Sequence, residues 1–570
     1  MTKARTLDPS SGGVSSGILE GRWSRRWAVG AALGLGLASS EALVAGRSPV
    51  EGRGNAVRRQ EAPARLTVLY NHNQFDFDPH AVVGDSSLLL LGVYEMLLQL
   101  KGDSPEAFAP MLADAWEANA DRSSFTFHLS PGAAFHDGSP CDAAAVKASF
   151  ARFLGMAAPS VYIVSRFVED PEQIVVLGDH TVRFDLDGAQ PLFLAAMASP
   201  FGAFVVNPRL VEAHRTADDP WAHAWFSRNS AGAGTGPYVV ADDRPGDQTV
   251  LRRFAGYHRA WSADRFGEVV IRVVKTEATR RQLLERGDAD IVTRLLRPED
   301  VAALASRPEL RVATYDSFDV GWIVMNAPKL RTPDVRRGFS YAFPYEEVVA
   351  GVEGGRRKRT GPIPAGMRGY DPEVFLYPTD LEQARSLILS GGFEEGDHFD
   401  FVYLADSENA RAIAQLFQAN LQAIGFSLDV VEVDQGALFD IGFGELPADE
   451  RPAFLGSWGW YPDYNDSWVH LAPCFRRSYV EGGAGAANPG LWANERFEQL
   501  MAEAEVATDE TRLDELMREA QRILTEQDPP CIYLGQQLYE TVHAADVAGF
   551  EGNPVYLNFY RFHQLRRIPG

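Results

Sequence analysis

The chain has 570 residues, which at roughly 100–200 residues per domain corresponds to about two to four domains. Hydrophobic residues make up 45% and charged residues 23%, a globular composition that excludes wholesale disorder and a fibrous repeat. With 54 Lys and Arg against 77 Asp and Glu, the net charge is -23. Such a chain lacks the positive charge that neutralises nucleic-acid phosphates, so we expect no nucleic-acid partner.

Residues 1–45 have the pattern of a signal peptide. Arg25 and Arg26 precede an apolar run over 27–38, which is shorter than the roughly 20 residues that a transmembrane helix needs. The paired arginines favour the twin-arginine export route. A Sec signal in which two arginines are adjacent by chance remains the alternative.

Residues 46–64 are polar and are expected to form a linker. No later segment is apolar for long enough to span a membrane. We therefore expect a soluble protein, not embedded in a membrane, that is exported to the periplasm of a Gram-negative cell.

The first half of the chain mixes predicted strands and helices. Short apolar or alternating runs predict strands over 66–70, 124–129, 181–186, 269–274 and 289–292. A buried helix is expected over 86–98. A second helix begins after its N-cap Asp142 and carries Val146, Phe150 and Phe153 on its apolar face.

The second half has a clearer α/β pattern. Thr379 and Glu382 suggest a capping box at the start of a helix, which Gly391 and Gly392 end. Helices are predicted over 410–424, after Asn494 and over 513–524, and strands over 426–433 and 531–534. This mixture predicts the α/β class with several domains.

Recognised catalytic motifs are missing from the sequence. The pattern Gly13-Val-Ser-Ser-Gly17 matches a nucleophile elbow, but it lies before the export signal and not between a strand and a helix. The 12 histidines lack metal-ligand spacing, and Cys141, Cys474 and Cys531 form no CxxC pair. We therefore expect no enzymatic activity, no cofactor and no bound metal.

Several motifs occur in the same order and with the same spacing as in a known protein family. They lie at 109–116, 125–129, 135–140, 146–150, 234–238, 335–342 and 459–466. Together they resemble the extracytoplasmic solute-binding proteins of ABC transporters, family 5, the peptide- and nickel-binding type. The resemblance covers roughly residues 65–565.

Two of these motifs are expected to serve the architecture. His136-Asp137-Gly138 reads as a turn, because Asp can bond its own backbone and Gly tolerates a positive φ. The glycines of 234–238 fit a crossing between domains, where the backbone must bend freely.

The segment Trp458–Trp468 is the candidate binding site, because five aromatic residues and two carboxylates fall within eleven residues. Its periodicity is that of neither a strand nor a helix, which predicts a loop or strand end. A loop with so many aromatics is typical of a ligand-cleft wall; an aromatic plug at a domain edge is the alternative. The candidate ligand-binding residues are Trp458, Gly459, Trp460, Tyr461, Asp463, Tyr464 and Asp466.

The resemblance implies a role for Asp463. In peptide-binding members, the matching aspartate pairs with the α-amino group of the ligand, in a Gly-Trp-x-x-Asp-Tyr context that Gly459, Trp460 and Tyr464 reproduce. Ser467 stands where many members have proline. The ligand is therefore expected to be a short peptide or peptide-like amine, with an oligosaccharide, an opine or a metal chelate as alternatives.

The resemblance also implies a fold and a mechanism. The fold is of the periplasmic-binding-protein type II, with two lobes made of three structural domains around a ligand cleft. Domain I is expected over 65–107, 231–320 and 541–570, domain II over 108–230, and domain III over 321–540. A monomer would capture its solute by lobe closure and deliver it to an inner-membrane ABC permease.

Two other functions remain open from the sequence. A periplasmic hydrolase could use Asp463 and Asp466 as general acid and base, but the sequence shows neither a matched partner nor a perturbed pKa. A chaperone-like binder of extracytoplasmic proteins would need an exposed apolar surface more than a closed pocket.

Overall fold

The computed structural model describes residues 64–71, 75–81, 88–156, 158, 160–293, 296–405, 407–444, 446–477, 488–507, 509–557 and 560–569. These residues belong to one compact unit, Ala62–Gly570. The predicted signal peptide (1–45) and all but the last residue of the predicted linker (46–64) lie outside the described residues. Among the described residues, every helix is too short or too polar to serve as a membrane span.

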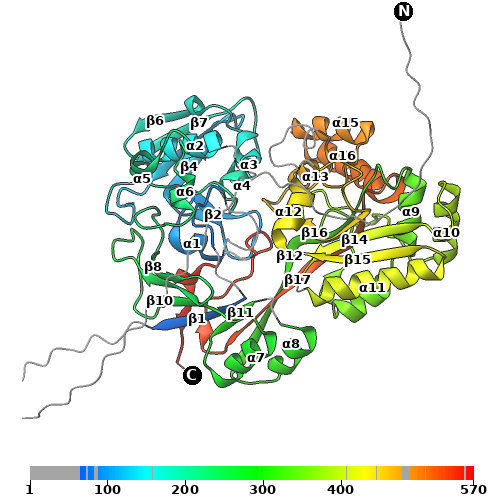
Figure 1. Ribbon diagram of the computed structural model, residues 1–570. Helices are drawn as coiled ribbons and strands as arrows, with labels where there is room; N and C mark the ends of the chain where they lie inside the picture. The colour runs from blue at the N-terminus through cyan, green and yellow to red at the C-terminus, as the bar shows by residue number, and fades with distance from the viewer. Residues whose placement is uncertain are drawn as a thin grey trace, which may run out of the picture. The chain divides into compact units, whose positions relative to one another are not determined.

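An eleven-stranded mixed sheet is the largest element of the fold (Figure 1). Its strands follow the order β15 (Ser427–Val433), β14 (His398–Leu404), β16 (Phe454–Trp460), β12 (Leu310–Met325), β17 (Cys531–Ala544), β11 (Ile291–Thr293), β1 (Arg65–Tyr70), β10 (Glu268–Val273), β9 (Gln248–Arg253) and β8 (Tyr238–Arg244), while β13 (Arg357–Lys358) pairs with β17. β14 is parallel to β15 and β16, and β1 is parallel to β10 and β11. The remaining neighbours are antiparallel.

Helices supply the crossovers that parallel neighbours require. α11 (Glu408–Ala423) joins β14 to β15, and α7 (Glu277–Arg286) lies between β10 and β11 along the chain. In α11, the Ser407 hydroxyl caps the first turn, and Ile413, Phe417 and Leu421 are buried at helical spacing. The predicted α/β class is confirmed.

A separate antiparallel sheet has the order β4 (Ala113–Ala118), β5 (Ser124–Leu129), β7 (Thr181–Asp185) and β6 (Ile174–Gly178). Helix α2 (Ala143–Met156) contacts β6 and β7. The Phe150 and Phe184 rings lie 5.3 Å apart between helix and sheet. As predicted, Asp142 caps α2, its carboxylate accepting the Ala145 amide at 2.8 Å.

The remaining described helices and strands are mostly short. The helices are α1 (Leu90–Val93), α3 (Tyr162–Ser165), α4 (Phe193–Met197), α5 (Pro208–His214), α6 (His223–Phe226), α8 (Pro298–Ala305), α9 (Pro333–Ala342), α10 (Leu381–Ser390), α12 (Gln435–Phe443), α13 (Ser467–Phe475), α15 (Glu495–Glu505) and α16 (Glu510–Arg522). Single turns of other helix types are η2 (Pro171–Gln173), η3 (Glu347–Val352), η4 (Ile523–Gln527) and η5 (Phe562–Gln564), and the minor strands are β2 (Leu98–Leu100), β3 (Phe108–Pro110), β18 (Val547–Ala548) and β19 (Arg566–Arg567).

A buried ion cluster fixes the segment 75–81 against α2. Arg152 donates to both carboxylate oxygens of Asp78, at 2.9 and 2.6 Å, and both side chains are fully buried. Arg152 also donates to His80, whose other ring nitrogen lies 2.8 Å from the Phe204 carbonyl. Burial, followed by the Arg152 charge, lowers the pKa of His80 to about 4, so the imidazole is neutral here.

The predicted helix over 86–98 is wrong in extent. In the described part of that range, helical structure ends at Val93, after a 3-10 turn at 88–89 and the short helix α1, and Leu98 begins β2. Every residue of 88–98 is buried, so the run has no polar face by which its pattern could separate helix from strand. The chain leaves the helix at Tyr94, whose φ of -118° and ψ of 163° are extended.

The capping box predicted at Thr379 and Glu382 is also wrong. Asp380 caps α10, and its carboxylate accepts the amide of Gln383 at 2.9 Å. The Thr379 hydroxyl instead donates to the Phe343 carbonyl at 2.7 Å. The side chain therefore ties the helix entrance to the preceding helix region and leaves capping to the next residue.

Replacing Asp380 with alanine is expected to lower the free energy of unfolding by about 1 kcal/mol, because the first turn of α10 loses its cap. Asp380→Asn keeps an acceptor at this position and should unfold like the wild type. Urea unfolding of both variants tests this assignment. An Asp380→Ala protein as stable as the wild type would contradict it.

The two architectural motifs differ in outcome. The turn is confirmed: Asp137 accepts the Ser139 amide at 2.8 Å, and Gly138 has a φ of +84°. At Gly234 and Gly236, an added Cβ would lie 2.0 Å and 2.7 Å from the Val93 carbonyl oxygen. These glycines therefore allow two backbones to pack closely, and bending at a crossing between domains stays a prediction.

Candidate ligand-binding site

A β-bulge shapes the strand that leads into the site. Gly456 and Ser457 of β16 stand opposite a single residue of β12, because Leu455 pairs with Val324 and Trp458 with Trp322. Ser457 has a φ of 54°, which is uncommon for a residue other than glycine. Such a bulge re-aims the side chains that follow it, here the aromatic residues of the candidate site.

The prediction of a loop or strand end over Trp458–Trp468 is right except at its last two residues. Strand β16 continues to Trp460, and α13 begins at Ser467, so the irregular part is 461–466. The bulge breaks the strand's alternation, and Asp466 and Ser467 begin a helix whose nine residues are all buried. Neither element therefore shows the period that a half-exposed strand or helix has.

The structure brings the predicted residues together on this short segment, with different exposure. Trp458, Asp463, Tyr464 and Asp466 are buried, while Gly459, Trp460 and Tyr461 are partly exposed. Trp458 packs against Phe443, with ring centroids 5.2 Å apart. A Cβ at Gly459 would lie 2.3 Å from the Val320 carbonyl oxygen, so this position must be glycine for the pairing of β16 with β12.

Asp463 is a buried carboxyl group with few partners. Its side chain accepts a hydrogen bond from the Tyr162 hydroxyl at 2.6 Å, and only 5% of the residue is exposed. Within the described part of the chain it makes no salt bridge. Burial raises the pKa of Asp463 to about 7, and the Tyr162 hydroxyl and the Trp460 indole oppose this rise. The indole lies close enough for that effect without a hydrogen bond of normal geometry.

Asp466 has a structural task that the sequence did not reveal. It is the N-cap of α13, and its carboxylate accepts the Trp468 amide at 2.9 Å. It is fully buried. Burial raises its pKa, while Arg166 and Arg368 nearby act in the opposite direction. Asp466 thus has cations beside it, whereas the described neighbours of Asp463 are neutral.

Residues far away in sequence complete the surroundings. Tyr162 contacts Asp463, and Arg166 donates to the Tyr464 hydroxyl at 3.3 Å. The side chain of Asn465 donates to Glu106 at 3.1 Å and accepts the Arg368 amide at 3.2 Å. Sequence reasoning missed Tyr162, Arg166, Glu106 and Arg368, because no local pattern links positions separated by about 100 to 360 residues.

Several buried polar atoms next to this segment have no hydrogen-bond partner among the described residues. They are the indole nitrogens of Trp458 and Trp460, one carboxylate oxygen of Asp466, the hydroxyl of Ser467 and both ring nitrogens of His470. Buried polar groups are normally hydrogen-bonded, so these atoms can serve a polar ligand or ordered water. The arrangement combines aromatic walls, a buried carboxylate and unused donors, which suits an organic molecule that carries one positive charge.

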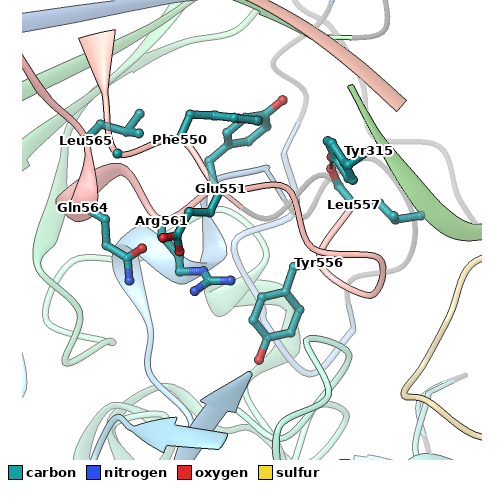
Figure 2. A pocket seen from close by; sticks show the side chains of 10 residues that line it. Tyr315, Phe550, Glu551, Tyr556, Leu557, Arg561, Gln564 and Leu565 are labelled. Atoms are coloured by element: carbon teal, nitrogen blue, oxygen red, sulfur yellow. Dashed lines mark hydrogen bonds between the residues drawn. The ribbon is translucent and has the colours of Figure 1, made fainter. Parts of the chain in front are cut away.

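A small cavity lies elsewhere in the fold, among Tyr315, Glu551, Tyr556 and Arg561 (Figure 2). Its volume is about 20 Å³, which is room for about one water molecule. Ligand pockets usually measure about 300–1,000 Å³, and no residue of 458–468 lines this cavity. It is therefore too small to be the ligand-binding site.

Comparisons with known proteins agree with the fold and with the sequence motifs. The E. coli K12 protein named "Probable D,D-dipeptide-binding periplasmic protein DdpA" is 29% identical over 484 residues, covering 83% of this chain and 88% of that protein. "Di/tripeptide-binding protein 2" of Pseudomonas aeruginosa UCBPP-PA14 is 28% identical over 473 residues, covering 78% and 84%.

A solved structure shares the fold. The dipeptide binding protein from Pseudoalteromonas sp. SM9913, in complex with Met-Leu, has a TM-score of 0.76 at 22% identity and covers 88% of this chain and 100% of that one. The predicted type II periplasmic-binding-protein fold is thereby confirmed. Residues 107–480 match the family described as "Bacterial extracellular solute-binding proteins, family 5 Middle". Because this match spans more than half of the 570 residues, the protein belongs to the family 5 bacterial extracellular solute-binding proteins.

Proposed function

We propose that this protein is the periplasmic substrate-binding component of an ABC importer and that its ligand is a short peptide or peptide-like amine. It would do no chemistry on the ligand and would hand it to a membrane permease. Family membership supports the transport role, and relatives named for di- and tripeptide binding support the ligand class. Export through the twin-arginine route is part of the proposal and rests on Arg25 and Arg26.

The observation that carries the ligand class is the environment of Asp463. A carboxyl group that is buried among aromatic rings, next to no cation, is stabilised in its ionised form by a positive charge brought by the ligand. A peptide's α-ammonium group supplies that charge, and its adjacent chain can pack on Trp460 and Tyr461. Asp463 would thus be the anchor, with Trp458, Gly459, Tyr464 and Asp466 forming its surroundings.

A hydrolase remains less well supported than a binder. The perturbed pKa of Asp463 meets one requirement of a general acid, but acid–base catalysis also needs a second group poised for the reaction. Asp466, the partner that the sequence suggested, is occupied as the N-cap of α13.

We propose the three-domain division of the sequence analysis as the basis of ligand capture. The four-stranded sheet lies wholly within 108–230, the proposed domain II. β12 and β17 are paired along their length and cross the proposed borders between domains I and III at 320/321 and 540/541. Domains I and II would then move together, because the Asp78–Arg152 pair and the β2–β3 pairing join them, and domain III would rotate about these two strands, closing over the ligand.

Isothermal titration calorimetry with paired ligands tests the proposed function. Dipeptides retained by the purified protein in native mass spectrometry would be compared with their N-acetylated forms and with a neutral oligosaccharide. We expect the free peptides to bind and acetylation to weaken binding by at least about thirtyfold, because a buried charge then lacks its partner. Equal binding of both forms, or binding of the oligosaccharide alone, would contradict the proposal.

A further inference from the structure

A short segment of the proposed domain II reaches into the candidate site. Helix α3 and the residue after it place Tyr162 and Arg166 four positions apart, so both side chains project from the same side of one helical turn. Tyr162 contacts Asp463, and Arg166 contacts Tyr464, the next residue. One turn thus touches two consecutive residues of the candidate site.

Arg166 is held by three contacts with other segments, two hydrogen bonds and one cation–π contact. Its guanidinium donates to the Tyr464 hydroxyl at 3.3 Å and to the Glu505 carbonyl at 3.1 Å. Its Cζ atom lies 4.0 Å from the ring centroid of Trp468, within the range of a cation–π interaction. Arg166 therefore joins α3 to the start of α13 and to the end of α15.

The charge of Arg166 acts on one of the two buried aspartates and not on the other. Among the residues that the structure describes, Arg166 and Arg368 act on Asp466, whereas none with a positive charge acts on Asp463. Burial alone would lower the pKa of Arg166, but Tyr464 and Asp466 raise it, so the guanidinium stays charged. Arg166 thus opposes the effect of burial on Asp466, and Asp463 has no comparable positive charge among its described neighbours.

We infer that Arg166 is a positioning residue for ligand capture: it locks domain II onto the Tyr464–Trp468 segment when the lobes close. This inference rests on the proposed function. Arg166 itself does not need to touch the ligand. Its loss should therefore shorten the lifetime of the complex and leave the encounter with the ligand nearly unchanged.

Three variants test this inference in the full-length mature protein. Arg166→Ala removes all three contacts. Arg166→Lys keeps the charge but loses the planar guanidinium group, which stacks on an aromatic ring and donates two hydrogen bonds. Arg183→Ala is the control. Arg183 pairs with Asp185 on the exposed side of β7 and has no contact with the site. Stopped-flow fluorescence of the site tryptophans would measure association and dissociation of a dipeptide that the wild type binds.

We expect the dipeptide to dissociate from Arg166→Ala at least about tenfold faster than from the wild type, and to associate at a rate within about twofold of the wild-type rate. Mutations that weaken a complex usually change its dissociation rate more than its association rate. Arg166→Lys should fall in between, and Arg183→Ala should match the wild type. Arg166→Ala and Arg183→Ala with equal dissociation rates would overturn the inference, as would a slower association with unchanged dissociation. Failure of the wild type to bind any dipeptide would instead overturn the proposed function.

A variant that merely unfolds would be recognised by its melting curve without ligand. If Arg166→Ala melts far below the wild type, the dissociation rates of Arg166→Lys and Tyr162→Phe are measured instead. Tyr162→Phe removes the hydroxyl that donates to Asp463 and keeps the ring. Faster dissociation in both of these folded variants supports the inference, and wild-type rates in both overturn it.

Discussion

Replacing Asp463 with alanine is expected to weaken the binding of a peptide with a free amino terminus by at least about thirtyfold. The carboxylate lies among aromatic rings with only 5% of the residue exposed, so salt screens an ion pair there little. Removing one partner leaves the ligand's ammonium group buried and unpaired, which costs roughly 2–5 kcal/mol. At about 1.4 kcal/mol per tenfold change, the lower limit corresponds to the stated loss.

Two further variants serve as controls in the same calorimetric titration. Asp466→Ala removes the N-cap of α13, so we expect a loss of about 1 kcal/mol in stability and a much smaller loss of affinity. Trp460→Ala should weaken binding of charged and neutral ligands alike, because it removes a partly exposed ring on which a ligand can stack.

Equal affinity of the wild type and Asp463→Ala would refute the role of Asp463 as an amine anchor. It would favour a neutral ligand such as a sugar, for which the aromatic side chains and the unused donors of Ser467 and His470 would be the main contacts. A loss with Asp466→Ala as large as that with Asp463→Ala would contradict the separate roles assigned to the two aspartates.

Much of the fold could be predicted where local patterns are strong. Residues of the strand Ser124–Leu129 alternate between buried and more exposed positions, and α11 carries its apolar residues at helical spacing. The sequence therefore predicts both elements with nearly correct ends. The helix predicted over 86–98 is wrong in extent, because the run over 88–98 is buried on all sides and its pattern has no period. The cap at Asp380 was missed by one residue, since Thr379 is an equally good N-cap by type.

The residue types of the candidate site could be predicted from the sequence, but the contacts that its residues make could not. The aromatic and acidic residues of 458–468 stand out in the sequence, whereas Tyr162 and Arg166 lie about 300 residues earlier and meet them only through the tertiary fold. Sequence alone also cannot separate Asp463 from Asp466. Their difference depends on which carboxylate caps a helix and which lies near a guanidinium.

Peptide affinity is expected to fall about tenfold for each pH unit below 7, reaching roughly a hundredfold loss at pH 5. Burial raises the pKa of Asp463 to about 7, and the ligand's ammonium group pairs only with the ionised form. Below pH 7 the carboxyl must therefore lose a proton before it can bind, and binding releases that proton. Above about pH 8 the peptide's α-amino group loses its own charge, so affinity should be greatest between about pH 7 and 8.

The stability of the protein without peptide should change in the opposite sense. The pKa of Asp463 is higher in the folded state than its ordinary value of 3.8. Its contribution to stability is then complete below about pH 4 and is lost as the pH rises through 7. The rise corresponds to about 4 kcal/mol at most. Asp463→Asn removes this group, so the variant's free energy of unfolding should decline less between pH 4 and 7 than that of the wild type.

Calorimetry between pH 5 and 8 in buffers of different ionisation enthalpy measures both the affinity and the number of protons released. We expect the wild type to release close to one proton on binding at pH 6, and Asp463→Asn to bind weakly with an affinity that is flat between pH 5 and 7. Burial also raises the pKa of Asp466, but Asp466 is present in both proteins, so a slope that the wild type shows and Asp463→Asn lacks is attributable to the Asp463 carboxyl group. A wild-type affinity that is independent of pH from 5 to 7, with no proton released, would show that an ionised Asp463 does not bind the ligand's cation.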